Sequence, residues 1–175
     1  MRLTLILAFL VPLISSGQLS KKDSLWQPLI PFLGKWKGSG EGVDGIGSYQ
    51  RSYNLVLGRN YVEMRNKTIY LPNEKAKNGY THEDVGYISY DKMRKTFVFR
   101  QFHGEGFVNQ YKLDSISGDM KSLVFVSEAI ENIPEGWRAK EVLTLTDAGF
   151  TEIFSLAEPG KEFQEYSKAT FVKTK

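Results

Sequence analysis

One stretch decides the fold class: Gly34-Lys35-Trp36-Lys37-Gly38-Ser39-Gly40-Glu41-Gly42. Glycine at alternate positions removes the side chains from one face of an extended strand, which permits sharp coiling or the close approach of another backbone. Trp36 can bury its ring while its N–H finds an acceptor. The stretch is not a phosphate loop, because no strand precedes it, no helix follows it and the Lys-Ser/Thr ending is missing. We interpret it as a curved first strand that turns a barrel corner, with a pocket-lining Trp36 as the equal alternative.

From Trp36 onward, apolar and polar residues alternate with period two, which indicates half-buried strands. Turn signals rich in Gly, Asp and Pro separate these strands, and the short gaps predict antiparallel hairpins. No helical pattern lies between any two strands, which argues against βαβ units. The candidate strands are residues 35–41, 49–57, 61–70, 84–90, 95–102, 106–113, 122–128, 137–145, 151–156 and 164–174.

Ten short strands in a meander leave two exposed edges unless the sheet closes on itself. We therefore predict an all-β fold, a ten-stranded antiparallel up-and-down β-barrel, with a two-sheet sandwich as the competing fold. Ser24 is placed to cap a brief helix that Pro28 and Pro31 keep short. We expect this segment to act as a helical plug at one end of the barrel.

The N-terminus has the features of a secretory signal. Arg2 precedes an apolar run over residues 3–13, and the small residues Ser15 and Gly17 stand where a signal peptidase would cut. The run is too short to cross a hydrocarbon core of about 30 Å comfortably. We expect a signal peptide over residues 1–17 and one barrel domain over residues 18–175, exported to the periplasm or the extracellular space, with no membrane span.

Composition excludes several classes of site. The chain has no Cys and only two His, so disulfides, thiolate metal sites and cysteine nucleophiles are ruled out, and we expect no metal site. The formal charge of +3 comes without a basic cluster, which argues against a nucleic-acid partner. No Gly-x-Ser-x-Gly elbow occurs. An enzyme is therefore the less favoured interpretation, with His103 as a weak base in a cofactor-free enzyme as its remaining form.

Two motifs carry a resemblance to known proteins. The Gly34-x-Trp36 pair resembles the calycin signature of lipocalins and fatty-acid-binding proteins. The fuller run to Gly42, preceded by Leu33, resembles the opening of the nitrobindin family of haem-binding β-barrels. The segment His82-x-Asp84-x-Gly86-Tyr87 is similar to that family's His-x-Glu-x-Gly-aromatic strand, with Asp in place of Glu. The resemblance implies a lipocalin-like, ten-stranded antiparallel barrel.

The resemblance also implies haem, and there the chain departs from the family. Nitrobindin-like proteins bind ferric haem through a His on the last strand and act on reactive nitrogen species. Here Tyr166 stands about where that His would be. A phenolate can ligate ferric haem, and a nearby cation would be needed to deprotonate it. The alternative is a barrel-lining aromatic residue with a satisfied hydroxyl, in which case no cofactor is expected.

Strand parity predicts which residues line the interior, because the apolar face of each strand must point to the core. Acidic residues on strands, such as Glu141 and Asp84, are expected on the solvent face. His103 is in register with Phe97, Phe99 and Gln101, so it points inward at the barrel rim if they do, with a solvated turn histidine as the favoured interpretation. The candidate ligand-binding residues are Trp36, Tyr53, Met64, Tyr87, Phe99, His103, Tyr111, Trp137 and Tyr166.

These observations predict a secreted or periplasmic lipocalin-like barrel that binds an apolar or amphipathic small molecule. Two alternatives remain open at this point. One is a nitrobindin-type haem protein. The other is an interaction module with a solid core, because a filled barrel would show much the same pattern.

Overall fold

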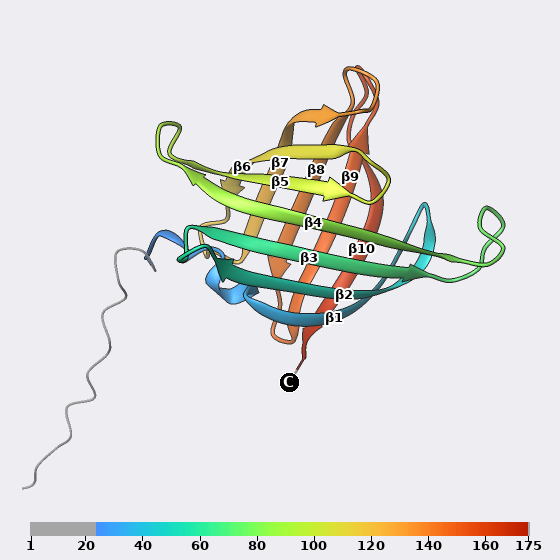
Figure 1. Ribbon diagram of the computed structural model, residues 1–175, viewed down its shortest axis with the longest axis horizontal. Helices are drawn as coiled ribbons and strands as arrows, with labels where there is room; N and C mark the ends of the chain where they lie inside the picture. Colours follow the sequence, from blue (N-terminus) through green and yellow to red (C-terminus); the bar gives the residue numbers. More distant parts are fainter. Residues whose placement is uncertain (1–23, 175) are drawn as a thin grey trace, which may run out of the picture.

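The computed structural model describes residues 24–174, so the predicted signal peptide lies outside the described residues. Ten antiparallel strands close into one barrel (Figure 1). Their bounds are β1 Gly34–Gly42, β2 Gly45–Val56, β3 Tyr61–Tyr70, β4 Tyr80–Asp91, β5 Thr96–His103, β6 Val108–Ile116, β7 Ser122–Glu131, β8 Arg138–Leu145, β9 Gly149–Ala157 and β10 Gln164–Lys173. No helix within residues 24–174 is long and apolar enough to cross a membrane.

Each strand pairs with the next one in sequence, and β1 pairs with β10 to close the sheet. This closure confirms the predicted ten-stranded antiparallel barrel and excludes the competing two-sheet sandwich. Strand β4 begins at Tyr80 rather than Asp84, because Tyr70 and Tyr80 continue the ladder and stack their rings 4.7 Å apart. Residues 80–83 are mostly polar and were not expected in a strand. They can form one because an antiparallel pair can expose one face to water.

The glycines of β1 allow the first and last strands to approach closely. A Cβ atom added at Gly40 would lie 2.4 Å from the carbonyl oxygen of Lys168 and 2.8 Å from the Cα of Ala169 on β10. Trp36 itself is buried, and its indole N–H donates to the carbonyl oxygen of Phe32 at 2.7 Å. The close approach of β1 to β10 agrees with a curved first strand, and Trp36 packs in the core.

We expect Gly40→Ala to destabilise the fold by about 1–3 kcal/mol, because the neighbouring atoms are backbone and cannot move aside cheaply. Chemical denaturation measures this difference. Gly118→Ala is the matched control, since a Cβ there meets nothing within 4 Å. An unchanged stability of Gly40→Ala would show that β1 and β10 are not held this close.

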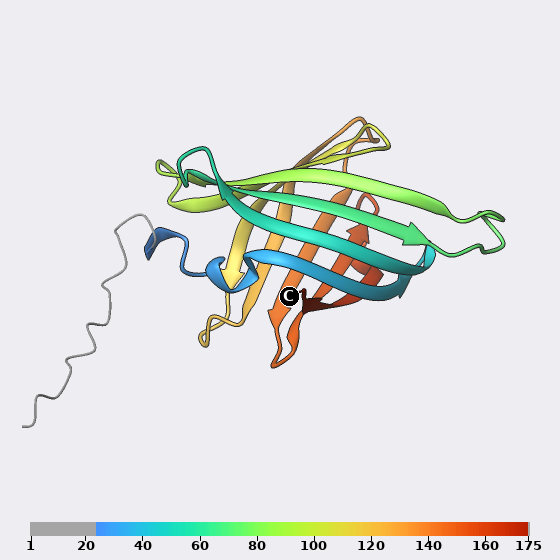
Figure 2. The same cartoon turned by 60° about the horizontal axis from the view of Figure 1, so that its bottom comes forward.

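One end of the barrel is filled with aromatic side chains. Phe32, Trp36 and Tyr53 all pack edge-on against Phe150, with ring centroids 5.4, 4.9 and 6.3 Å from it. The chain before β1, which ends in a 3-10 helix over Ile30–Phe32, lies at this end (Figure 2). Its buried residues Trp26, Leu29 and Phe32 belong to the same core cluster.

The predicted inward face is found on most strands. Val62, Met64, Phe97, Phe99, Tyr111, Leu123, Phe125, Ala139 and Leu143 are all buried. On β4 the prediction was wrong by one residue: Asp84, Gly86 and Ile88 are buried, and Tyr87 lies on the outer face, where its hydroxyl donates to Glu63. The error arose because the aromatic Tyr87 was assigned to the inward face and Asp84 to the solvent face, whereas Asp84 is the buried residue.

Candidate functional site

A row of polar side chains crosses the inside of the barrel. Arg51, Asn66, Asp84 and His103 are direct cross-strand partners on β2, β3, β4 and β5. The alternation of each strand turns all four to the same face. The first three are at most 7% exposed. Burial of so many polar groups is costly unless each is paired, so their partners determine what this row can do.

Most of the row is paired. Arg51 forms an ion pair with Glu152 of β9 and donates from Nε to Asn66 Oδ1 at 3.1 Å. Asn66 in turn donates to Asp84 Oδ2 at 2.9 Å, and Gln101 donates to Asp84 Oδ1 at 2.8 Å. The Asp84 carboxylate is thus fixed by two amides. Arg51 is neutralised within the protein, so it is not free to receive an anionic ligand.

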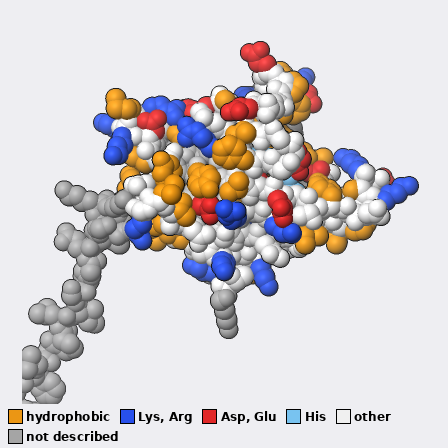
Figure 3. All heavy atoms as spheres, in the orientation of Figure 1, with side chains coloured by type: hydrophobic (Ala, Val, Ile, Leu, Met, Phe, Trp, Pro, Cys, Tyr) orange, Lys and Arg blue, Asp and Glu red, His pale blue; other side chains and the backbone are white. Residues whose placement is uncertain are grey.

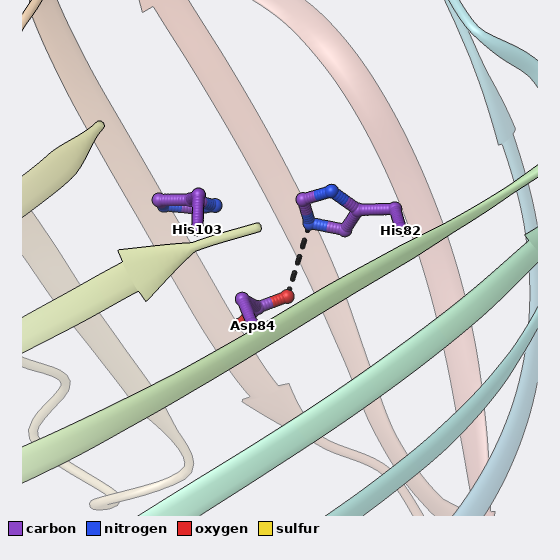
Figure 4. A group of neighbouring side chains, drawn as sticks. All are labelled: His82, Asp84 and His103. Carbon is purple, nitrogen blue, oxygen red and sulfur yellow. Dashed lines mark ion pairs between the residues drawn. The ribbon is translucent and has the colours of Figure 1, made fainter. Parts of the chain in front are cut away.

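The row ends in a cluster of two histidines and one carboxylate (Figure 4). His82 Nε2 lies 3.1 Å from Asp84 Oδ2, and His82 Nδ1 lies 2.7 Å from Glu105 Oε1. His103, at the end of β5, faces His82 with the ring centroids 5.6 Å apart and stacks on Phe107 at 4.0 Å. His82, Asp84 and His103 each offer one atom that could bind a metal ion, and these three atoms lie within 4.8 Å of one another.

The two histidines have opposite electrostatic environments. Burial lowers the pKa of His82, but its hydrogen bonds to Asp84 and Glu105 outweigh burial and raise the pKa to about 9. Burial lowers the pKa of His103 to about 4. Burial raises the pKa of Asp84, but the His82 hydrogen bond and the field of Arg51 leave it below its ordinary value. Near neutral pH the cluster therefore holds one charged imidazole, one neutral imidazole and one carboxylate.

Glu141 on β8 is a buried carboxyl that was expected on the solvent face. It stands between Ala139 and Leu143, which both face inward, so its parity places it inside. Burial and the nearby Glu152 carboxylate raise the pKa of Glu141 to about 8. Tyr111 hydrogen-bonds to it, and Asn109 donates to the Tyr111 hydroxyl at 2.8 Å.

Three buried polar atoms have no hydrogen-bond partner among residues 24–174: Gln101 Oε1, His103 Nδ1 and Asn109 Oδ1. They gather at one place, because Gln101 and Asn109 are direct partners on β5 and β6 and Asn109 Nδ2 lies 3.2 Å from His103 Nε2. A buried polar atom left without a partner costs about 1–3 kcal/mol. Such a cluster at the end of a barrel marks a place where an external group can supply the missing partners.

The same end carries half-buried apolar side chains. Ile130 is the direct partner of Asn109, and Phe107 stacks on His103. Phe154 packs edge-on against Tyr166 at 5.7 Å. These residues and Leu156 are only partly buried, unlike the aromatic side chains at the opposite end. We call this region, with His82, Gln101, His103 and Asn109, the polar mouth.

Tyr166 lies at the polar mouth but does not fit a haem-ligating phenolate. Its hydroxyl donates to Asp44 Oδ2 at 2.9 Å. Burial and this hydrogen bond raise the pKa of Tyr166 to about 12. A ligating phenolate needs a neighbouring cation, and the charges that act on Tyr166 are the carboxylates of Asp44 and Glu105. We therefore derive no chemistry through a haem held by Tyr166.

The structure divides the predicted ligand-binding residues into four groups. Trp36, Tyr53, Met64, Phe99 and Tyr111 are buried inside. His103 and Tyr166 lie at the polar mouth. Trp137 is half-buried in the loop before β8, and Tyr87 is outside.

The sequence predicted the inward register of Gln101 and His103 with Phe97 and Phe99 on β5, and Gln101 is buried. It missed the rest of the polar interior: Asn66, Asp84, Asn109, Glu141 and Glu152. Where the inward-facing positions of a strand change from apolar to polar residues, the hydrophobic core ends.

A groove of about 1110 Å³ runs along the same strands, and its lining includes the polar row itself, Arg51, Asn66, Asp84 and His103. Lys37, Arg65 and Lys67 are among its lining residues, together with Phe102, which is 43% exposed. On the face seen in Figure 3, basic and acidic side chains are interspersed. Glu83 pairs with Lys67 at 2.9 Å inside the groove.

No protein-family model matches the chain, and no curated protein matches it in sequence. Among solved structures, the chain is similar to that of Rv2717c from M. tuberculosis, with a TM-score of 0.64 and 16% identity over 90% of this chain and 100% of the other. A designed fluorescence-activating β-barrel matches with a TM-score of 0.37 and 16% identity over 83% of this chain and 95% of that one. The first similarity shows the fold alone.

Proposed function

We propose that this protein is a lipocalin-like small-molecule-binding barrel whose polar mouth receives the polar group of an amphipathic ligand. The observation that carries the proposal is the cluster of unpartnered buried atoms at Gln101, His103 and Asn109. The barrel fold suits this role, since barrels of this kind hold ligands at their mouths. The ligand's apolar part would lie against Phe107, Ile130, Phe154 and Leu156.

The unpartnered atoms also define the polar group. Gln101 Oε1 and Asn109 Oδ1 need hydrogen-bond donors. His103 is neutral near pH 7 and Asn109 Nδ2 points to its Nε2, so its Nδ1 carries the proton and needs an acceptor. The surrounding carboxylates of Asp84 and Glu105 disfavour an anion. A neutral group with both donors and acceptors, such as a hydroxyl or an amide, fits this set.

The binding site differs from a hollow that runs through the whole barrel. Met64, Tyr111, Leu123 and Phe125 are at most 1% exposed, so the middle is packed with side chains. We propose that the segment before β1 acts as the plug of the opposite end, where Trp26 and Phe32 are equally buried. The ligand therefore enters at the polar mouth only. The calycin and nitrobindin resemblance, and export through residues 1–17, remain part of this proposal.

Native mass spectrometry of the protein purified from its own host tests the proposal. We expect an additional mass from a co-purified small molecule. Asn109→Leu should lower its occupancy roughly tenfold, because one hydrogen-bond partner is worth about 1–3 kcal/mol. Asn54→Leu, an exposed position on β2, is the matched control and should keep the ligand. The bare chain mass in the wild-type protein, or equal occupancy in both variants, would contradict the proposal.

A further inference from the structure

We infer that His82, Asp84 and His103 form a binding site for one divalent transition-metal ion, with an open coordination position toward the polar mouth. This inference goes beyond the proposed function, because the metal would bind whether or not an organic ligand does. Two histidines and one carboxylate are the ligand set of several open metal sites, both of zinc enzymes and of non-haem iron proteins.

The distances of the cluster fit such an ion. Ligand atoms about 2.0–2.1 Å from a tetrahedral metal lie roughly 3.3 Å from one another. His82 Nε2 and Asp84 Oδ2 are 3.1 Å apart, so they already have this spacing. The donor atom of His103 lies within 4.8 Å of both, and a rotation of this side chain would bring it closer. Figure 4 shows the three side chains converging from β4 and the end of β5.

The surroundings of the cluster match the second shell of a metal site. A histidine ligand usually donates its other ring N–H to a carboxylate or a carbonyl group, which fixes the tautomer. His82 Nδ1 has this partner in Glu105 Oε1 at 2.7 Å. The Asp84 carboxylate is oriented by Asn66 and Gln101 through bonds of 2.9 and 2.8 Å. Both ligands on β4 are thus oriented by hydrogen bonds to residues outside the cluster.

His103 supplies the third ligand, and metal binding would give its ring nitrogen Nδ1 the partner that it lacks. Its Nδ1 is buried and has no hydrogen-bond partner among the described residues. With Nδ1 on the metal, the Nε2 proton would need an acceptor. Asn109 lies 3.2 Å away, and its Oδ1 becomes that acceptor when the side-chain amide turns over, in which case Oδ1 also replaces Nδ2 beside the Tyr111 hydroxyl. Metal binding thus gives the unpartnered His103 Nδ1 a partner.

Calorimetric titration of the tag-free, chelator-treated full chain with ZnCl₂ tests this inference. We expect one Zn²⁺ per chain. Asp84→Asn and His103→Gln should each weaken binding by more than roughly 100-fold, and Glu105→Gln by about 10–100-fold, the range seen for second-shell partners. Glu83→Gln is the matched control, because it makes the same charge change one residue from Asp84 on the outer face, and should bind as the wild type does.

Circular dichroism of each variant verifies that it is folded. Glu105→Gln tests the metal site at an exposed side chain, whose loss does not disturb the core. Absence of Zn²⁺ binding to the wild-type chain would overturn the inference. So would binding that is unchanged in both Glu105→Gln and His103→Gln. A chain that does not bind Zn²⁺ can still carry a co-purified small molecule. A chain with no co-purified small molecule can still bind Zn²⁺, so each experiment tests only its own proposal.

Discussion

Arg51→Met is expected to destabilise the barrel by about 3–5 kcal/mol, because it leaves a buried carboxylate without its counter-charge. Arg51 is fully buried, and it pairs with Glu152 while lying close to Asp84. Its guanidinium also lies over the ring of Phe171, 4.7 Å from the centroid. Removing it leaves the carboxylates of Glu152 and Asp84 without this positive charge inside the barrel. Urea denaturation at neutral pH measures the loss.

Two control variants make this prediction specific. Arg65→Met removes an arginine whose side chain is 64% exposed, from a surface pair with Glu63, and should cost less than about 1 kcal/mol. The double variant Arg51→Met/Glu152→Met removes the pair together and should recover much of the stability, since apolar replacements of buried pairs are often tolerated. A single Arg51→Met variant as stable as Arg65→Met would show that the ion pair is not buried as described.

Glu141→Gln is expected to stabilise the protein in alkaline solution and to change little in acid. The folded-state pKa of about 8 lies above the ordinary value of 4.5. The folded chain therefore keeps a proton that the unfolded chain releases, and the stability falls as the pH rises between these two values. Above pH 8 the carboxylate is ionised in both states, and its burial cost is fully present.

The amide removes this cost while still accepting the Tyr111 hydroxyl. At pH 9 the gain should be up to about 5 kcal/mol, because the pKa rises from 4.5 to about 8 and each unit corresponds to about 1.4 kcal/mol. At pH 5 the gain should be less than about 1 kcal/mol. Thermal unfolding followed across this range measures both, with Glu41→Gln on the exposed side of β1 as the control. A pH-independent effect of Glu141→Gln would contradict a neutral buried carboxyl.

The barrel was predictable because its determinants are local. Period-two alternation and short turns specify ten hairpin-linked strands, and the alternate glycines of β1 permit the close contact with β10 that closes the sheet. Strand ends were less predictable. Strand β4 begins at Tyr80 because its extension is held by pairing with β3, and nothing within residues 80–83 indicates that pairing.

The polar mouth was only partly predictable for a physical reason. A carboxylate on a strand usually faces water, so Asp84 and Glu141 were assigned to the outside. Their burial depends on partners distant in sequence: Asn66 and Gln101 for Asp84, and Tyr111 for Glu141. Such partnerships exist only once the strands have paired in register. The two histidines were visible in the sequence, but the 20 residues between them are compatible with many distances in space, and only the β4–β5 register brings them together.

The central claim is that the polar mouth is a binding site, and a high-resolution crystal structure of the protein purified from its own host tests it most directly. The account predicts electron density for a bound group in contact with Gln101 Oε1, His103 Nδ1 or Asn109 Oδ1. A map in which all three atoms are satisfied by the protein's own side chains, with no bound group beside them, would contradict it.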